Sequence, residues 1–136
     1  HMRKDIDFPV SENVFLAAIQ QWNDDFQENT WFVHLVNNTG ETLEMVMIVS
    51  QAYGMINNEQ RATGTFRHAF NEVKADTFTK IEMLENKVLQ LNNKFTLSYF
   101  LNNKMYDKTF VFEADTIVEK EATDIPGSDF KGILLK

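Results

Sequence analysis

Short segments in which apolar and polar residues alternate recur along most of the chain, at intervals of about ten residues. These segments are rich in Val, Ile, Thr and aromatic residues, and clusters of Asn and Gly separate them. The pattern predicts an all-β fold, an antiparallel β-sandwich of about eight strands, with an immunoglobulin-like arrangement as one form that it can take. The predicted strands span residues 13–22, 31–37, 43–50, 63–70, 77–84, 94–101, 104–113 and 130–135.

The clearest local prediction is a hairpin between Phe95 and Phe112. Two alternating segments flank Asn102-Asn103, and asparagine tolerates the positive φ that a two-residue turn requires. When Leu101 opposes Lys104, one face of this hairpin is apolar and belongs to the core. One lysine also falls on that apolar face, so it must reach solvent at an edge or be displaced by a bulge. The predicted pairs are Tyr99 with Tyr106, Phe95 with Phe110, Ser98 with Asp107 and Leu97 with Lys108.

A second hairpin is predicted between Trp31 and Ser50, with residues 37–40 as its loop. Both of its strands carry apolar residues on two faces. Such strands lie at the centre of a sheet, or at a surface that a partner covers.

Met45, Met47 and Val49 lie on one face of the second of these strands. We expect this face to be an interface with a protein partner or with a second copy of the chain. The alternative is that the two methionines fill gaps in the core.

The segment 13–26 also fits a helix, which would make the fold α+β. Ser11 or Asn13 would cap this helix, and its apolar residues recur at helical spacing. Periodicity alone leaves strand and helix open for this segment. The residues of the helical stripe are Phe15, Ala18, Ile19, Trp22 and Phe26.

The length of 136 residues predicts one domain over residues 1–136, with residues 1–8 as a flexible tail and His1 left over from expression. The formal net charge of −7 disfavours nucleic acid as a partner, because phosphate binding needs clustered Lys and Arg. There is no cysteine, which excludes disulfides and thiol chemistry and fits a reducing, cytoplasmic location. No secretory signal and no membrane span are expected, because the longest apolar runs are about six residues.

Two histidines, His34 and His68, belong to predicted strands, where each shares a face with apolar neighbours. A hydrogen-bonded histidine in or beside the core is the favoured interpretation. The functional alternative brings both histidines together with Asp107 or Glu82, and no pattern in the sequence requires that arrangement.

A polar cluster at residues 63–68 holds the densest set of groups able to bind an anion or a carboxylate. Alternation places Thr65 and Arg67 on the face opposite His68. A structural arginine that pairs with an acidic side chain on a neighbouring strand is the simpler explanation. Thr65, Arg67, His68 and Asp107 are therefore the candidate ligand-binding residues, and no catalytic residue is assigned.

Acidic pairs such as Asp24-Asp25 lack the loop pattern that calcium requires. The chain also has no glycine-rich phosphate loop, no nucleophile elbow and no zinc-binding helix motif. No metal and no cofactor are therefore expected.

Seven short segments carry a resemblance to a known family: 31–37, 45–50 with Tyr53-Gly54, Arg67-His68, 80–82, 91–93, 106–108 and 110–112. Together they resemble a family of short uncharacterised bacterial proteins that often carry the label phenylalanyl-tRNA synthetase alpha subunit. The resemblance spans most of the chain and favours a strand over residues 13–22. It implies no catalytic residues, and synthetase activity is not expected, because the chain has neither the size nor the ATP-binding motif of such an enzyme.

Two functions follow from the sequence. The first is a non-catalytic protein-interaction module of a bacterial cytoplasm, which acts through the face of Met45, Met47 and Val49. The second is a small-molecule site or a minor enzyme built on Arg67, His68 and Asp107, which requires these three side chains to line one pocket.

Overall fold

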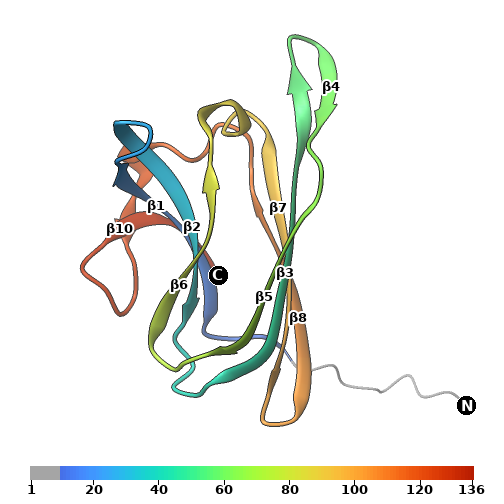
Figure 1. The fold of residues 1–136 in the computed structure, drawn as a ribbon, viewed down its shortest axis with the longest axis vertical. Helices are drawn as coiled ribbons and strands as arrows, with labels where there is room; N and C mark the ends of the chain where they lie inside the picture. Colours follow the sequence, from blue (N-terminus) through green and yellow to red (C-terminus); the bar gives the residue numbers. More distant parts are fainter. Residues whose placement is uncertain (1–9) are drawn as a thin grey trace, which may run out of the picture.

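The computed structural model describes residues 10–136, and two antiparallel sheets pack face to face in it (Figure 1). The prediction of an all-β sandwich is confirmed, and the predicted tail at residues 1–8 lies outside the described residues. The strands are β1 (Val14–Asn23), β2 (Glu28–Asn37), β3 (Leu43–Ile56), β4 (Glu59–Ala62), β5 (Phe66–Val73), β6 (Thr77–Leu84), β7 (Asn92–Leu101), β8 (Lys104–Phe112), β9 (Thr123–Asp124) and β10 (Lys131–Leu135). Two single-turn 3₁₀ helices, η1 (Asn86–Val88) and η2 (Glu119–Glu121), complete the described part.

The first sheet has the strand order β6-β2-β1-β10-β9, and the second has the order β4-β3-β7-β8, with β5 also paired to β3. We call these the β2 sheet and the β3 sheet. The long β3 pairs with β5 along its first part and with β4 at its end. The hairpin of β3 and β4 projects beyond the sandwich (Figure 1).

The core lies between the two sheets, where the inward side chains of both interdigitate. On the side of the β3 sheet, the core consists largely of aromatic side chains. Phe95 and Tyr99 are two of them, and each is 1% exposed. A second, smaller apolar cluster lies on the outer face of the β2 sheet, around Phe15 and Val36. Ile125 covers that cluster from the segment between β8 and β10. Strand β1 is therefore buried on both faces.

Burial on two faces explains why residues 13–26 matched a helix as well as a strand. Residues 14–19 are all buried, so no polar face marks the period of two. The helical alternative is wrong, because residues 14–23 of this segment form β1 and pair with β2. Trp22 and Phe26, which belonged to the helical stripe, are 57% and 50% exposed.

The β7–β8 hairpin has the predicted register at every pair, including Leu97 with Lys108. Asn102 and Asn103 take φ values of 52° and 63° in its turn. Lys108 extends along the core edge: its Nζ lies 3.5 Å from the Ser11 carbonyl oxygen and 4.9 Å from the centre of the Phe110 ring. Burial lowers the pKa of this lysine.

The predicted hairpin between Trp31 and Ser50 is wrong. Strand β2 lies between β1 and β6, whereas β3 lies between β5 and β7 in the other sheet. Each strand is central, as its two apolar faces indicated, but the loop between them crosses from sheet to sheet. Asn37 stabilises the loop that crosses between the sheets, because its Nδ2 donates to the carbonyl oxygens of Glu41, Val73 and Lys74.

Candidate functional site

The four residues predicted to bind a ligand lie in two separate places. Arg67 pairs with Val49 and is exposed on the outer face of the β3 sheet, whereas His68 pairs with Ile48 and faces the other sheet. Asp107 lies on the outer face of β8, and β3 and β7 separate it from the strand that carries Arg67. Thr65 is exposed in the stretch before β5. The single pocket that Arg67, His68 and Asp107 were expected to form is therefore not present.

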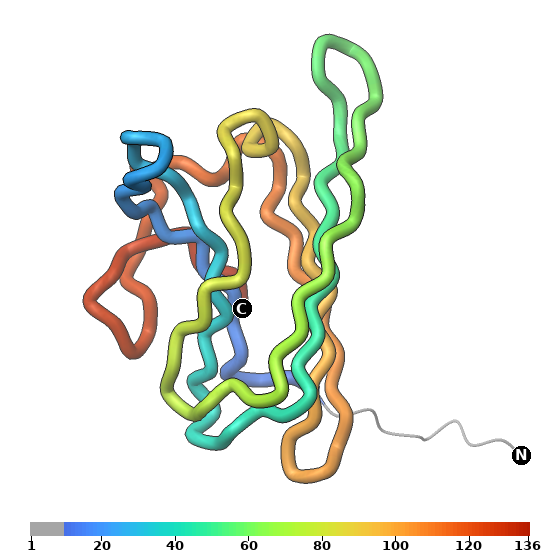
Figure 2. The backbone as a smooth tube through the Cα atoms, viewed as in Figure 1, coloured from blue at the N-terminus to red at the C-terminus, as the bar shows by residue number. Residues whose placement is uncertain are grey.

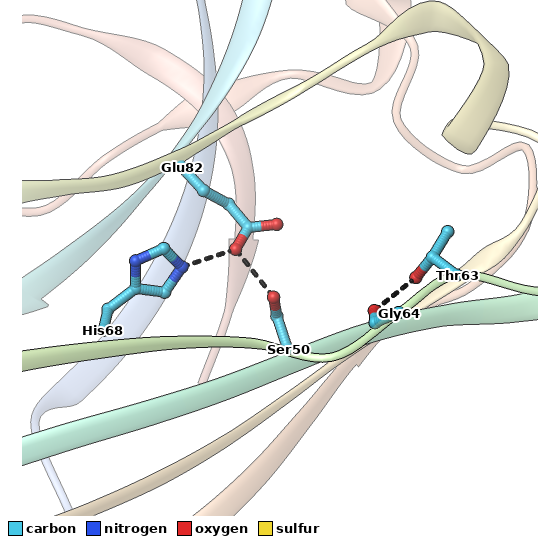
Figure 3. A network of polar contacts seen from close by, with 5 residues as sticks. All are labelled: Ser50, Thr63, Gly64, His68 and Glu82. Carbon is cyan, nitrogen blue, oxygen red and sulfur yellow. Dashed lines mark hydrogen bonds and ion pairs between the residues drawn. The ribbon is translucent and has the colours of Figure 1, made fainter.

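His68 instead meets Glu82 and Ser50 between the two sheets, as Figure 3 shows. The Oε1 atom of Glu82 accepts hydrogen bonds from Ser50 Oγ and from His68 Nε2, each at 2.7 Å. The side chains of His68 and Glu82 are 23% and 18% exposed, and Ser50 is buried. The sequence offered Glu82 only as one member of a cluster of both histidines with Asp107 or Glu82, and of that set the structure brings His68 and Glu82 together.

A β-bulge places Glu82 on the inner face of the β2 sheet. Strand β6 pairs Glu82 with Val33 and Lys80 with His34, which leaves Ile81 as an extra residue. Without that insertion, strict alternation would put Glu82 on the same outer face as Lys80. The bulge turns both Ile81 and Glu82 inward, and this is how a carboxylate comes to lie between the sheets.

A cleft of about 420 Å³ opens beside Glu82, at the edge of the sandwich where β6 and η1 face β3. Its lining residues come from residues 50–66 and from residues 82–95, and Figure 2 shows the course of these two stretches of backbone. We call it the edge cleft. Apolar atoms make up most of the surface that lines it. The lining residues are Ser50, Gln51, Ala52, Thr63, Phe66, Glu82, Met83, Leu84, Glu85, Lys87, Val88, Asn93 and Phe95.

The arrangement of Ser50, Glu82 and His68 differs from that of a nucleophilic serine. In such a site the imidazole contacts the hydroxyl group and removes its proton. Here the carboxylate lies between the two other groups, and among residues 10–136 no hydrogen bond links Ser50 to His68. The geometry therefore describes a carboxylate held in place by two donors, which suits the binding of a hydrogen-bond donor or a cation.

His34 lies far from this group, on the outer face of the β2 sheet beside Phe78, with the two ring centres 6.5 Å apart. Its Nδ1 lies 3.2 Å from the Phe32 carbonyl oxygen, and the residue is 6% exposed. Burial lowers the pKa of His34, the hydrogen bond to Phe32 opposes this, and the nearby Lys80 lowers it further. His34 is thus the core histidine that the sequence favoured, and the functional alternative that joined it to His68 is wrong.

The outer face of the β3 sheet carries an exposed apolar surface, which we call the methionine face: Met45, Met47, Val49, Phe100 and Met105. The three methionines are 69%, 45% and 55% exposed in that order. Phe100 pairs with Met105 across the hairpin, and Met47 lies in the next strand of the sheet. Met45 and Met47 therefore do not fill gaps in the core, which was the alternative drawn from the sequence.

No group of three or more His, Cys, Asp or Glu side chains in residues 10–136 is placed to hold a metal ion. Within the same range, no helix has the length and apolar character needed to cross a membrane.

Comparison with known proteins identified no relative: no family model, no curated protein and no solved structure matches this chain. The resemblance to the short bacterial proteins described above stays a prediction.

Proposed function

We propose that this protein is a non-catalytic interaction module of the bacterial cytoplasm that pairs with a second copy of itself through the methionine face. The observation that carries the proposal is the exposure of three methionines on one face of an otherwise well-packed sheet. On the opposite face of the same central strand, Val46 and Ile48 are 1% and 0% exposed. Exposed apolar side chains that gather on one face of a folded domain favour an interaction site, and methionine adapts its shape to a partner.

The charges that flank the methionine face favour a second copy as the occupant. Arg67 lies on β5 at one margin of the face, and Asp107 lies on β8 at the other. A two-fold axis that runs along the strands between β3 and β7 superposes β5 of one copy on β8 of the other. Each Arg67 then lies within two residues of the opposing Asp107, so the contact forms twice.

The size of the face predicts a weak dimer. Four strands at about 4.8 Å spacing and eight residues at about 3.3 Å each give a projected area of roughly 500 Å² per copy. This is below the roughly 800 Å² per partner of a standard stable interface. We therefore expect dissociation constants in the micromolar range, at about 8 kcal/mol of binding free energy or less.

Sedimentation velocity over a concentration series tests the proposal. The wild-type chain should shift from monomer to dimer between roughly 5 and 500 µM. Met47→Lys places a charge at the centre of the face and should keep the protein monomeric throughout. Met55→Lys is the matched control: it makes the same change on the same strand, at a residue 55% exposed that pairs only with Gln60 of β4, outside the face.

A charge exchange tests the two-fold arrangement itself. Arg67→Glu should weaken the dimer through repulsion from Asp107 of the second copy, and the double variant Arg67→Glu with Asp107→Arg should restore it. A wild-type chain that stays monomeric at every concentration contradicts the proposal. Equal effects of Met47→Lys and Met55→Lys would do the same.

A further inference from the structure

The edge cleft lies on the inner side of the β3 sheet, opposite the methionine face, so the two surfaces are independent. Its floor is made of buried side chains, among them Ala52, Leu84 and Phe95, which are 4%, 2% and 1% exposed. Phe66 stands at its rim and is 57% exposed, although it belongs to the core-facing side of β5. The volume of about 420 Å³ lies in the range of small-molecule sites.

Glu82 supplies the polar anchor of this cleft. Its Oε1 atom already accepts two hydrogen bonds, from Ser50 and His68. Among the described residues no donor contacts its Oε2 atom, which points away from His68 and toward the side of Thr63 (Figure 3). Thr63 lines the cleft, so this second oxygen is directed at the space that a ligand would fill.

The chemistry around Glu82 selects a cation with an apolar body. A partly buried carboxylate needs compensation for its lost hydration, and an N–H donor that carries a positive charge supplies the strongest form of it. The exposed ring of Phe66 can also receive a cation on its face. At the rim, Lys87 Nζ lies 3.6 Å from a Glu85 carboxylate oxygen, so these two charges largely cancel and leave Glu82 as the anchor.

We infer that the edge cleft binds a small organic ammonium ion, whose N–H groups donate to Glu82 Oε2 and whose hydrocarbon part packs on Phe66, Leu84 and Val88. Ser50 and His68 act as positioning residues that hold the carboxylate in the orientation seen in Figure 3. Neutral alcohols have the same apolar contacts without the charge, and carboxylic acid anions are repelled.

Three probes of equal chain length test this inference: hexylammonium, hexan-1-ol and hexanoate, each titrated into the ¹⁵N-labelled full chain and followed by amide chemical shifts. Hexylammonium should shift amides that line the cleft, such as those of Ala52 and Leu84. It should bind at least about tenfold more tightly than hexan-1-ol, because a charged hydrogen bond is added. Hexanoate should cause no shifts at the cleft.

Glu82→Gln is the decisive variant, because the amide oxygen can still accept from Ser50 and His68 while the charge is lost. It should weaken hexylammonium binding about tenfold and leave hexan-1-ol binding unchanged. Glu85→Gln is the matched control at the rim and should retain most of the affinity. A second variant, Phe66→Ala, keeps the carboxylate and should weaken the binding of hexylammonium and hexan-1-ol together, which covers the case in which Glu82→Gln does not fold.

Three results would overturn the inference. One is equal affinity for hexylammonium and hexan-1-ol. Another is an equal loss of affinity in Glu82→Gln and Glu85→Gln. The third is a set of shifts spread over the acidic surface, as expected of a cation that binds nonspecifically to a chain of net charge −7.

Discussion

Gly132→Ala should destabilise the protein at the junction between β10 and β1. A Cβ atom built at Gly132 lies 2.4 Å from the backbone oxygen of Ala18 and 3.1 Å from Ile19 Cγ1. Backbone cannot move aside as a flexible side chain can, so the whole β10 strand must shift away from β1. The three residues of β10 that pair with β1 follow directly after this position.

The structure bounds the size of this effect. Relieving the contact with Ala18 requires a displacement of about 1 Å, and overpacking of this kind costs about 1–3 kcal/mol. If β10 instead separates from β1, the half-buried side chains of Ile133, Leu134 and Leu135 lose their packing, at about 1 kcal/mol each. The two routes together bound the loss at about 1–3 kcal/mol, which lowers the Tm by roughly 3–12 °C for a domain of this size.

Urea denaturation followed by tryptophan fluorescence measures this loss, because Trp31 is buried in the core and reports on its exposure. Gly64→Ala is the matched control: no atom lies within 4 Å of its Cβ position. That variant should be neutral or gain up to about 1 kcal/mol, because alanine restricts the unfolded chain. If the two variants are equally stable, the close approach of β10 to β1 is not the constraint described here.

Two further predictions follow from buried polar groups. Asn37→Asp replaces the amide that donates to three carbonyl oxygens with an oxygen that repels them, so it should cost about 2–4 kcal/mol in chemical denaturation. Asn38→Asp, at an exposed neighbour, should change the stability by less than about 0.5 kcal/mol, and similar losses in both would contradict the role of Asn37. The lowered pKa of His34 means that, as the pH falls, this histidine takes up a proton in the unfolded chain before it does so in the folded chain. The stability that the neutral His34 contributes is therefore complete above the unfolded pKa of 6.5 and is lost as the pH falls below that value. The Tm of the wild type should therefore drop more steeply than that of His34→Gln between about pH 7 and about pH 5.5, and parallel curves would show that His34 does not titrate in this way.

Local features of the sequence were enough to predict most of the strands and one complete hairpin. Alternation on both sides of Asn102-Asn103 determined the β7–β8 register, because a two-residue turn leaves one way to oppose its flanking residues. The same kind of signal stands at Asn57-Asn58, which have φ values of 53° and 64° in the turn between β3 and β4. It was missed because the following segment, β4, is exposed throughout and mostly polar, and so shows no alternation.

The identity of each strand's neighbours required the tertiary structure. Residues 31–50 contain two apolar strands and a good turn, yet β2 and β3 pair in different sheets. Each strand can pair with any other strand of the fold, and the neighbour in sequence is only one of these. Here β2 pairs with β1 and β6, and β3 pairs with β5 and β7. The second apolar face of β1 likewise depends on a segment distant in sequence, because Ile125 covers it.

The candidate sites show the same division. The sequence by itself determined the strand faces: it placed Arg67 and His68 on opposite sides of β5 and set Met47 and Val49 on a common face, because side chains alternate with a period of two. Only the tertiary structure decided that the face of Met47 is open to solvent, since exposure depends on what packs above a sheet. It also decided that Glu82 points inward, because the extra residue Ile81 reverses the alternation of β6 at that point. A bulge is set by how two strands fit together, so a single strand read by itself carries no sign of it.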